Sequence, residues 1–208
     1  MIPKRMKNKV VSLIFLSILS GFHTSIMAKN IVVFGDSLSA AYGMDLEKGW
    51  VSLLSESLKG QHTIHNASIS GETSAGGLAR LPLTIAELKP DLILLEIGAN
   101  DGLQGLSVKS IRANLDRMIQ LSLAAEVEIA VIGISLPATY GPRYIDEFRS
   151  TYSGLAEQYK LSFVDFYREE FVAAKGNIQA DGLHPTEKTQ PIIRDWVLEF
   201  LNKEGLLD

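Results

Sequence analysis

Ser37 is the first side chain in this sequence that could do chemistry. It stands within residues 35–38, Gly-Asp-Ser-Leu, directly after an apolar run at 31–34 that is typical of a strand covered on both faces. Gly35 permits a sharp turn, and open α/β sheets bind ligands just beyond the carboxyl ends of their strands. We therefore predict that Ser37 is a catalytic nucleophile. The alternative is that Ser37 is the N-cap of a helix that follows the strand.

A serine hydroxyl is a poor nucleophile until a base accepts its proton, and His184 is the candidate base. Asp181 lies three residues earlier. In a turn these two positions can face each other, so the carboxylate could orient the imidazole ring and stabilise its protonated form. Pro185 disfavours helical backbone at His184, which fits a loop. The alternative is an ordinary surface histidine.

An acyl-transfer site also needs hydrogen-bond donors for the oxyanion of the tetrahedral intermediate. The candidates are the backbone N–H groups of Ser37 and Gly71 and the side-chain amide of Asn100. Gly71 has no side chain, so a substrate oxygen can approach its N–H closely. Taken alone, Gly71 is a turn glycine and Asn100 an Asx-turn residue. The combination with Ser37 and His184 is what favours a hydrolase.

Composition excludes several other chemistries. The 208 residues contain no cysteine, which excludes a thiol nucleophile, thiolate metal ligands and disulfides. No His-Glu-x-x-His spacing occurs, so a zinc hydrolase is disfavoured, and we expect neither a metal nor another cofactor. Four of the 20 basic residues and none of the 24 acidic ones fall in residues 1–28, so the remainder carries a net charge of −8. That charge disfavours binding to nucleic acid.

Strands and helices alternate along the chain, and they must position these residues. We predict a three-layer α/β/α domain of the α/β class, with about five parallel strands in a flavodoxin-like order, 2-1-3-4-5. The expected strands are 31–34, 62–66, 91–97, 127–134 and 161–165. The expected helices are 50–60, 78–88 with Pro82 in its first turns, 107–125, 145–159 and 192–201.

The segments that carry the candidate residues follow successive strands. Ser37 follows the first strand, Gly71 lies in the loop 67–77 after the second, and Asn100 follows the third. The loop 135–144 follows the fourth, and the irregular segment 175–185 precedes the last helix. Because the carboxyl ends of parallel strands share one edge of the sheet, we expect these segments to converge there.

Residues 1–28 have the pattern of a secretory signal peptide. Four basic residues are followed by an apolar stretch at 10–22 and by a small residue, Ala28, at the expected cleavage position. We therefore divide the chain into a signal peptide at 1–28 and one domain at 29–208, and we expect a periplasmic or secreted protein with no stable membrane anchor after cleavage. The alternative is a retained N-terminal anchor.

These motifs resemble the SGNH (GDSL-type) hydrolase superfamily. Its four blocks are matched, in the family's order, by residues 35–38, by Gly71 in Ser-Gly-Glu-Thr, by 98–101 (Gly-Ala-Asn-Asp) and by 181–185 (Asp-Gly-Leu-His-Pro). Residues 66–74, 77–82 (Gly-Leu-Ala-Arg-Leu-Pro), 136–141 and 180–185 are similar to one branch, the periplasmic thioesterases that also act as lysophospholipases and arylesterases. The likeness covers essentially all of residues 29–208.

The resemblance implies a catalytic set of Ser37, Asp181 and His184 and an oxyanion hole formed by Ser37, Gly71 and Asn100. It also implies that the loop 135–144 responds to acyl chains. Within that loop Leu136, Pro137 and Tyr140 would bind substrate, with ordinary loop packing as the alternative.

We therefore expect a monomeric serine hydrolase that cleaves esters and thioesters of acyl chains through an acyl-Ser37 intermediate. Its partner would be a small acyl ester or thioester, with a lysophospholipid as one candidate. A carbohydrate O-acetyl esterase is the alternative enzyme, which the apolar loop 135–144 disfavours. The alternatives of another class are a flavodoxin-like module that binds phosphate or lipid, which would need no Asp181 or His184, and an inactive lipid carrier.

Overall fold

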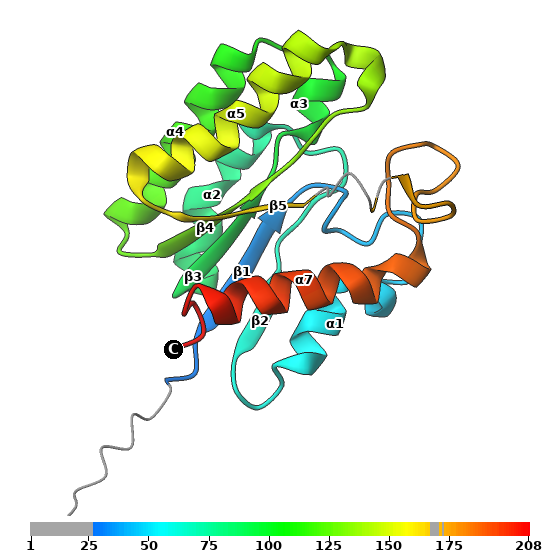
Figure 1. Ribbon diagram of the computed structural model, residues 1–208. Helices are drawn as coiled ribbons and strands as arrows, with labels where there is room; N and C mark the ends of the chain where they lie inside the picture. The colour runs from blue at the N-terminus through cyan, green and yellow to red at the C-terminus, as the bar shows by residue number, and fades with distance from the viewer. Residues whose placement is uncertain (1–26, 167–170, 172) are drawn as a thin grey trace, which may run out of the picture.

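The computed structural model describes residues 27–166, 171 and 173–208. Its centre is a five-stranded parallel sheet with strand order β2-β1-β3-β4-β5 (Figure 1). This confirms the predicted strand order and the parallel pairing. The strands are β1 (Asn30–Gly35), β2 (Thr63–Asn66), β3 (Leu92–Glu96), β4 (Glu128–Gly133) and β5 (Ser162–Asp165).

The central strands are apolar because helices cover both faces of the sheet. Residues 31–34 of β1 have no exposed surface, and all of β3 is buried, whereas the edge strands β2 and β5 are only partly buried. One buried acidic residue interrupts this pattern, because Glu96 ends β3 directly beside Gly35 of β1.

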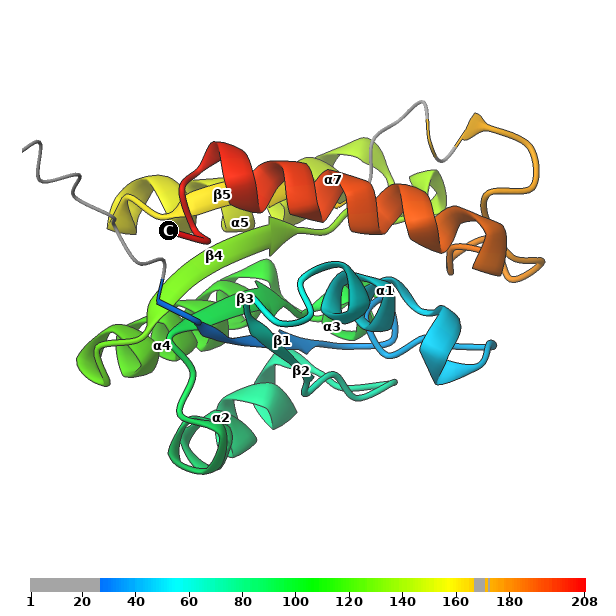
Figure 2. The ribbon, with the colours of Figure 1, turned by 90° about the horizontal axis from the view of Figure 1, so that it is seen from below.

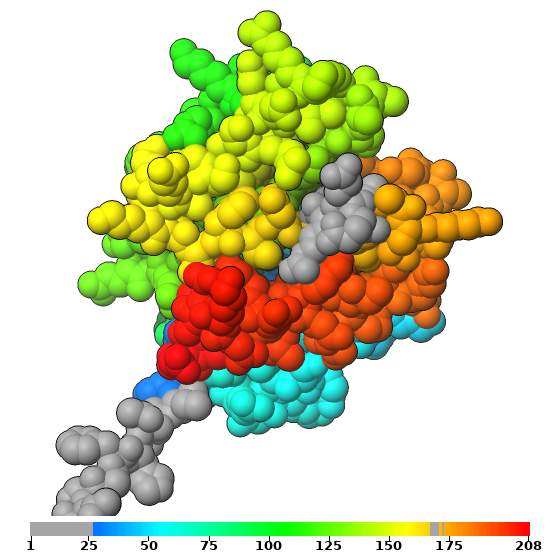
Figure 3. Space-filling model, viewed as in Figure 1, coloured from blue at the N-terminus to red at the C-terminus, as the bar shows by residue number. Residues whose placement is uncertain are grey.

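Two layers of helices enclose the sheet, as the sequence predicts (Figures 1 and 2). On one face α4 packs against both α2 and α5, and on the other α1 packs against α7. Figure 3 shows α7 in red next to α1 in cyan on the outer surface. These helices are α1 (Trp50–Ser57), α2 (Ser74–Leu88), α4 (Val108–Ala124), α5 (Pro142–Tyr159) and α7 (Gln190–Lys203). The shorter ones are η1 (Leu46–Lys48), α3 (Ala99–Leu103), η2 (Ala138–Tyr140) and η3 (Glu187–Thr189).

The helix α2 begins earlier than predicted, at Ser74 rather than at residue 78. The Thr73 side chain accepts a hydrogen bond from Gly76 N–H and caps the helix, and Ser74 donates from both its backbone N–H and its hydroxyl to Asp101. Pro82 therefore lies in the middle of the helix, and its predicted place in the first turns is wrong. Gly77, within the segment predicted to be a loop, allows α2 to approach Phe34 of β1 and Ile97 closely.

Two further segments differ from the sequence prediction. Asn100 lies in the first turn of α3, in a region predicted to be a loop, because Gly98 with φ of 123° turns the chain directly from β3 into this helix. The helix α5 begins at Pro142, so Tyr144 is helical and the loop after β4 is shorter than 135–144. Residues 175–185 contain no helix or strand, as predicted, and one isolated bridge joins Ile178 to Pro185.

The predicted signal peptide at 1–28 lies outside the described residues apart from its last two. Within the described part of the chain, no helix is long and apolar enough to cross a membrane.

We expect Gly77→Val in α2 to lower the free energy of unfolding by about 1–3 kcal/mol through overpacking. A Cβ atom at Gly77 would lie 2.5 Å from Ile97 Cδ1 and 3.3 Å from Phe34 Cε1, so the buried Ile97 side chain or the helix itself would have to shift. Urea unfolding measures the change.

The matched control is Ala79→Val, at an exposed position of the same helix, which should cost no more than about 0.7 kcal/mol. Valine has a higher helix propensity than glycine, so a loss at Gly77→Val no larger than that of the control would contradict close packing at Gly77.

Candidate active site

Ser37 lies in a run of turns that begins directly after β1, and no helix starts at this serine. Ser37 is therefore not the N-cap of a helix, which was the alternative role. The turn is held from two sides: the Trp50 indole N–H donates to the Leu38 carbonyl at 3.1 Å, and the Asn66 amide donates to the Ser39 carbonyl at 2.8 Å. Ser37 itself is 8% exposed. The serine thus has a fixed backbone and a small window to solvent.

Ser37, His184 and Asp181 form one hydrogen-bonded chain. Ser37 Oγ lies 2.8 Å from His184 Nε2, and His184 Nδ1 lies 2.7 Å from Asp181 Oδ2. The other carboxylate oxygen, Oδ1, accepts from the backbone N–H groups of Leu183 at 2.9 Å and His184 at 3.1 Å. Asp181 therefore shapes the turn that carries His184 and also orients its ring.

The surroundings of Asp181 favour its ionised form. Partial burial opposes ionisation, but hydrogen bonds from the His184 ring and from the Leu183 and His184 backbone outweigh it and lower the pKa of this carboxyl below its ordinary value. A carboxylate that stays ionised can stabilise the imidazolium that forms when His184 accepts a proton.

Two residues that we did not predict support His184. The Tyr42 ring stacks on the imidazole with centroids 4.1 Å apart and planes 25° apart. The Gln179 amide bridges the two segments, because its Nε2 donates to the carbonyls of Tyr42 at 3.0 Å and Pro185 at 2.9 Å. The sequence holds no signal for either contact, since both depend on how the turn after β1 packs against residues 177–185.

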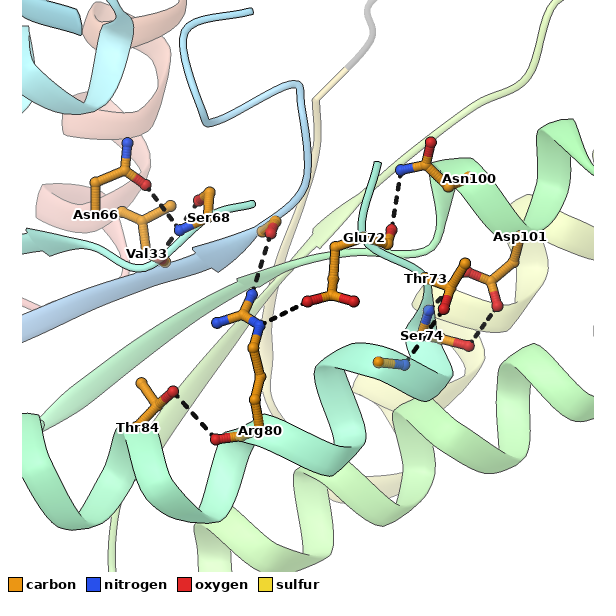
Figure 4. A network of polar contacts seen from close by, with 12 residues as sticks. Val33, Asn66, Ser68, Glu72, Thr73, Ser74, Arg80, Thr84, Asn100 and Asp101 are labelled. Carbon is orange, nitrogen blue, oxygen red and sulfur yellow. Dashed lines mark hydrogen bonds and ion pairs between the residues drawn. The ribbon is translucent and has the colours of Figure 1, made fainter. Parts of the chain in front are cut away.

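Glu72, which directly follows Gly71, links the Gly71 turn to Asn100. Gly71 is exposed, and its φ of 81° lies in the left-handed region that favours glycine. Asn100 Nδ2 donates to the Glu72 carbonyl at 2.9 Å (Figure 4). Ile69 N–H donates to the Gly35 carbonyl at 3.1 Å, which ties the Gly71 turn to the end of β1.

The three residues predicted to bind substrate lie after β4, and two of them, Leu136 and Tyr140, contact α3. Leu136 is buried and covers Gly102, and Tyr140 OH donates to the Leu103 carbonyl at 2.8 Å. Pro137 is half-buried between them. This segment therefore adjoins the short helix that carries Asn100.

Two buried carboxyl groups lie behind Ser37. Burial raises the pKa of Asp36 to about 7, although Asp36 accepts hydrogen bonds from the backbone N–H groups of Leu38 and Ala99. Burial and the nearby Asp36 charge raise the pKa of Glu96 well above its ordinary value. The Ser39 hydroxyl donates to Glu96 Oε2 at 2.6 Å. Together they tie the turn around Ser37 to β3 and α3, and the only signal in the sequence is an acid inside an apolar strand.

Within the described residues, no group of three or more His, Asp or Glu side chains could hold a metal ion.

Comparisons with known proteins identify the family of this chain. Residues 33–190 match the GDSL-like lipase/acylhydrolase family. Esterase TesA of Pseudomonas aeruginosa is 46% identical over 167 residues, which cover 79% of this chain and 83% of that protein. Thioesterase 1/protease 1/lysophospholipase L1 of Escherichia coli K12 is 38% identical over 174 residues and 84% of each chain.

A solved esterase structure has a similar fold. The psychrotrophic esterase EstA of Pseudoalteromonas sp., crystallised with monoethylphosphonate as inhibitor, superposes with a TM-score of 0.79. It is 39% identical, and the alignment covers 83% of this chain and 96% of that one. This chain therefore has the same overall fold as a solved esterase.

We expect Glu96→Gln to stabilise the protein over wild type by an amount that grows as the pH rises. The folded-state pKa of Glu96 is raised, so wild type loses stability as the pH increases from the ordinary value of 4.5 toward that raised pKa. A glutamine has the same shape and no proton to lose. Unfolding free energies measured from pH 4.5 to 8 test this.

The matched control is Glu157→Gln at an exposed position of α5. A pH-independent difference for Glu96→Gln, or the same trend in the control, would contradict the assignment of the pH dependence to the buried carboxyl.

Proposed function

This chain belongs to the GDSL-like lipase/acylhydrolase family and hydrolyses carboxylic esters and thioesters, and we propose that Ser37, His184 and Asp181 carry out this chemistry. One observation carries the assignment: the continuous chain of hydrogen bonds of 2.8 Å and 2.7 Å from the serine through the histidine to the aspartate. A nucleophile, a base and a residue that orients the base are what acyl transfer through a serine requires.

The proposed reaction has two halves. With the ring proton on Nδ1 donated to Asp181, His184 Nε2 takes the Ser37 hydroxyl proton while Oγ attacks the carbonyl carbon. The tetrahedral intermediate collapses to an acyl-Ser37 ester, and His184 gives its proton to the departing alcohol or thiol. Water then attacks the acyl group with His184 again as the base, and the serine is released with a carboxylic acid.

We propose Ser37 N–H, Gly71 N–H and Asn100 Nδ2 as the donors to the oxyanion. The left-handed, exposed backbone at Gly71 supports this, because the space where a side chain would stand is open to substrate. The Asn100 amide supports it as well: one of its two hydrogens is donated to the Glu72 carbonyl, which orients the amide and leaves the second hydrogen for substrate.

The substrate class that we propose is an acyl chain, carried on an ester, a thioester or a lysophospholipid. Exposed apolar side chains on loops after three strands support it, namely Tyr42, Ile69 and Leu106. Leu136, Pro137 and Tyr140 extend this apolar character beside α3. Burying a methylene group contributes about 0.8 kcal/mol, so such a surface favours longer acyl chains over acetate.

We also propose that the protein is exported as a monomer and that catalysis needs no metal or other cofactor. The basic and apolar pattern of residues 1–28 supports export. The proposed steps use only side chains, backbone N–H groups and water.

We expect purified protein to hydrolyse p-nitrophenyl esters and Ser37→Ala to lose at least about 10³-fold in kcat, because no other group forms the acyl intermediate. Asp181→Asn should lose on the order of 10³ to 10⁴-fold, because the amide no longer holds the ring in its productive tautomer. Folding of both variants is checked by circular dichroism.

Retained hydrolysis by Ser37→Ala would refute the nucleophile assignment. Activity confined to the acetate ester would replace the acyl-chain proposal with a carbohydrate O-acetyl esterase.

Acyl-chain length gives a separate test of the loop after β4. Tyr140→Ala should lower kcat/KM for octanoate or longer esters about tenfold more than for acetate, because roughly 1–2 kcal/mol of apolar contact with the ring is lost. The ladder of p-nitrophenyl esters from acetate to palmitate measures this.

The matched control is Tyr159→Ala at the C-terminal end of α5, where the hydroxyl also donates a hydrogen bond, to Asp116 at 2.8 Å. If Tyr140→Ala loses activity equally on short and long esters, this residue does not bind the acyl chain.

A further inference from the structure

An ion pair lies beneath the turn that carries Gly71. Arg80 Nε donates to Glu72 Oε2 at 2.8 Å, and the two side chains are only 21% and 15% exposed (Figure 4). Glu72 directly follows Gly71, whereas Arg80 lies on α2. Because both charges are partly withdrawn from water, solvent and salt screen this pair less than an exposed one.

The fold makes room for the carboxylate of this pair. A Cβ atom at Gly76, in the first turn of α2, would overlap Glu72 Oε1. The carboxylate therefore rests against the backbone at the start of the helix, where the helix dipole favours negative charge.

Arg80 also contacts the end of the strand that leads to the nucleophile. Its guanidinium carbon lies 3.8 Å above the centre of the Phe34 ring, and Nη2 donates a long hydrogen bond of 3.5 Å to the Gly35 carbonyl. One guanidinium thus links the Gly71 turn to the backbone two residues before Ser37. Only the flat, forked head group of arginine can stack on a ring and donate in two directions at once.

Glu72 connects the same ion pair to Asn100. Its side chain is held by Arg80, and its backbone carbonyl accepts from Asn100 Nδ2 at 2.9 Å. A shift of Glu72 would therefore move the N–H of the neighbouring Gly71 and the amide of Asn100 together. Both of these groups are proposed oxyanion donors, and both must lie correctly with respect to Ser37.

We propose that Arg80 is a positioning residue for the oxyanion hole: through Glu72 it sets the places of the Gly71 and Asn100 donors relative to Ser37. The proposal rests on the proposed function. The alternative is that Arg80 is an ordinary arginine on a helix surface. Its replacement would then change the stability of the protein but not the stabilisation of the transition state.

Oxyanion donors act mainly in the transition state, so the loss should appear in kcat. For Arg80→Met we expect kcat on p-nitrophenyl butyrate to fall about 10- to 100-fold, with KM changed by less than about twofold. An alkyl boronic acid, which forms a tetrahedral adduct on a serine, should bind more weakly by the same factor as kcat/KM falls.

Further variants separate positioning from folding. Glu72→Gln should show the same selective loss in kcat. Gly76→Ala should show it as well, although no charge is removed. Arg80→Lys should be more active than Arg80→Met but less active than wild type. The matched control is Arg117→Met on the exposed side of α4, which should keep wild-type kcat and boronic acid affinity. Urea midpoints show that each variant is folded under the assay conditions.

The proposal is overturned if folded Arg80→Met and Glu72→Gln keep wild-type kcat and boronic acid affinity, or if KM rises while kcat is unchanged. Failure of the proposed function is recognised separately, because Ser37→Ala would then remain active whatever the result at Arg80.

Discussion

A hydrogen bond of 2.8 Å between Ser37 Oγ and His184 Nε2 joins residues that lie 147 positions apart. The rest of the site depends on this contact, because a serine without a base in reach stays a poor nucleophile. The parallel sheet makes the contact possible by collecting the segments that follow its strands at one edge. The helices α1 and α7, which share one face of the sheet, hold the backbone next to Ser37 in place. Gln190 of α7 accepts a hydrogen bond from Trp50 N–H at the start of α1, and the Trp50 indole N–H donates to the carbonyl of Leu38.

Holding this edge together requires polar groups inside the core. Asp36 and Glu96 are fully buried next to each other, and both pKa values are raised because burial penalises their charge. Such groups cost stability compared with an apolar core. These two groups nevertheless connect the turn around Ser37 to its neighbours. Asp36 accepts a hydrogen bond from Ala99 N–H at the start of α3, and Glu96 accepts one from the Ser39 hydroxyl. The site is rigid because several hydrogen bonds from different strands converge on one turn.

The proposed chemistry and the proposed substrate class depend on different residues of the segments that follow the strands. Polar contacts hold Ser37, His184 and the Gly71 turn, whereas apolar side chains are exposed after β1, β2 and β3, and one of them, Tyr42, stacks on His184. An esterase for acyl chains needs both, since the ester is recognised by few polar groups and the chain by apolar surface. The ion pair between Glu72 and Arg80 belongs to the polar part, and it reaches the site from the outer helix α2.

The strand order, the layers and the residues of the proposed catalytic set could be predicted from the sequence, because apolar runs are local signals and Ser37, Asp181 and His184 lie in short motifs. Even the i, i+3 contact of Asp181 with His184 is local. The start of α2, the place of Pro82 and the helical turn at Asn100 could not be predicted, because Thr73, Asp101 and Gly98 decide them through contacts or backbone angles that local periodicity does not encode. The stacking of Tyr42 on His184, the buried pair Asp36 and Glu96, and the bridge from Arg80 to Glu72 were decided by tertiary structure alone. Each joins segments whose proximity exists only after the sheet has assembled.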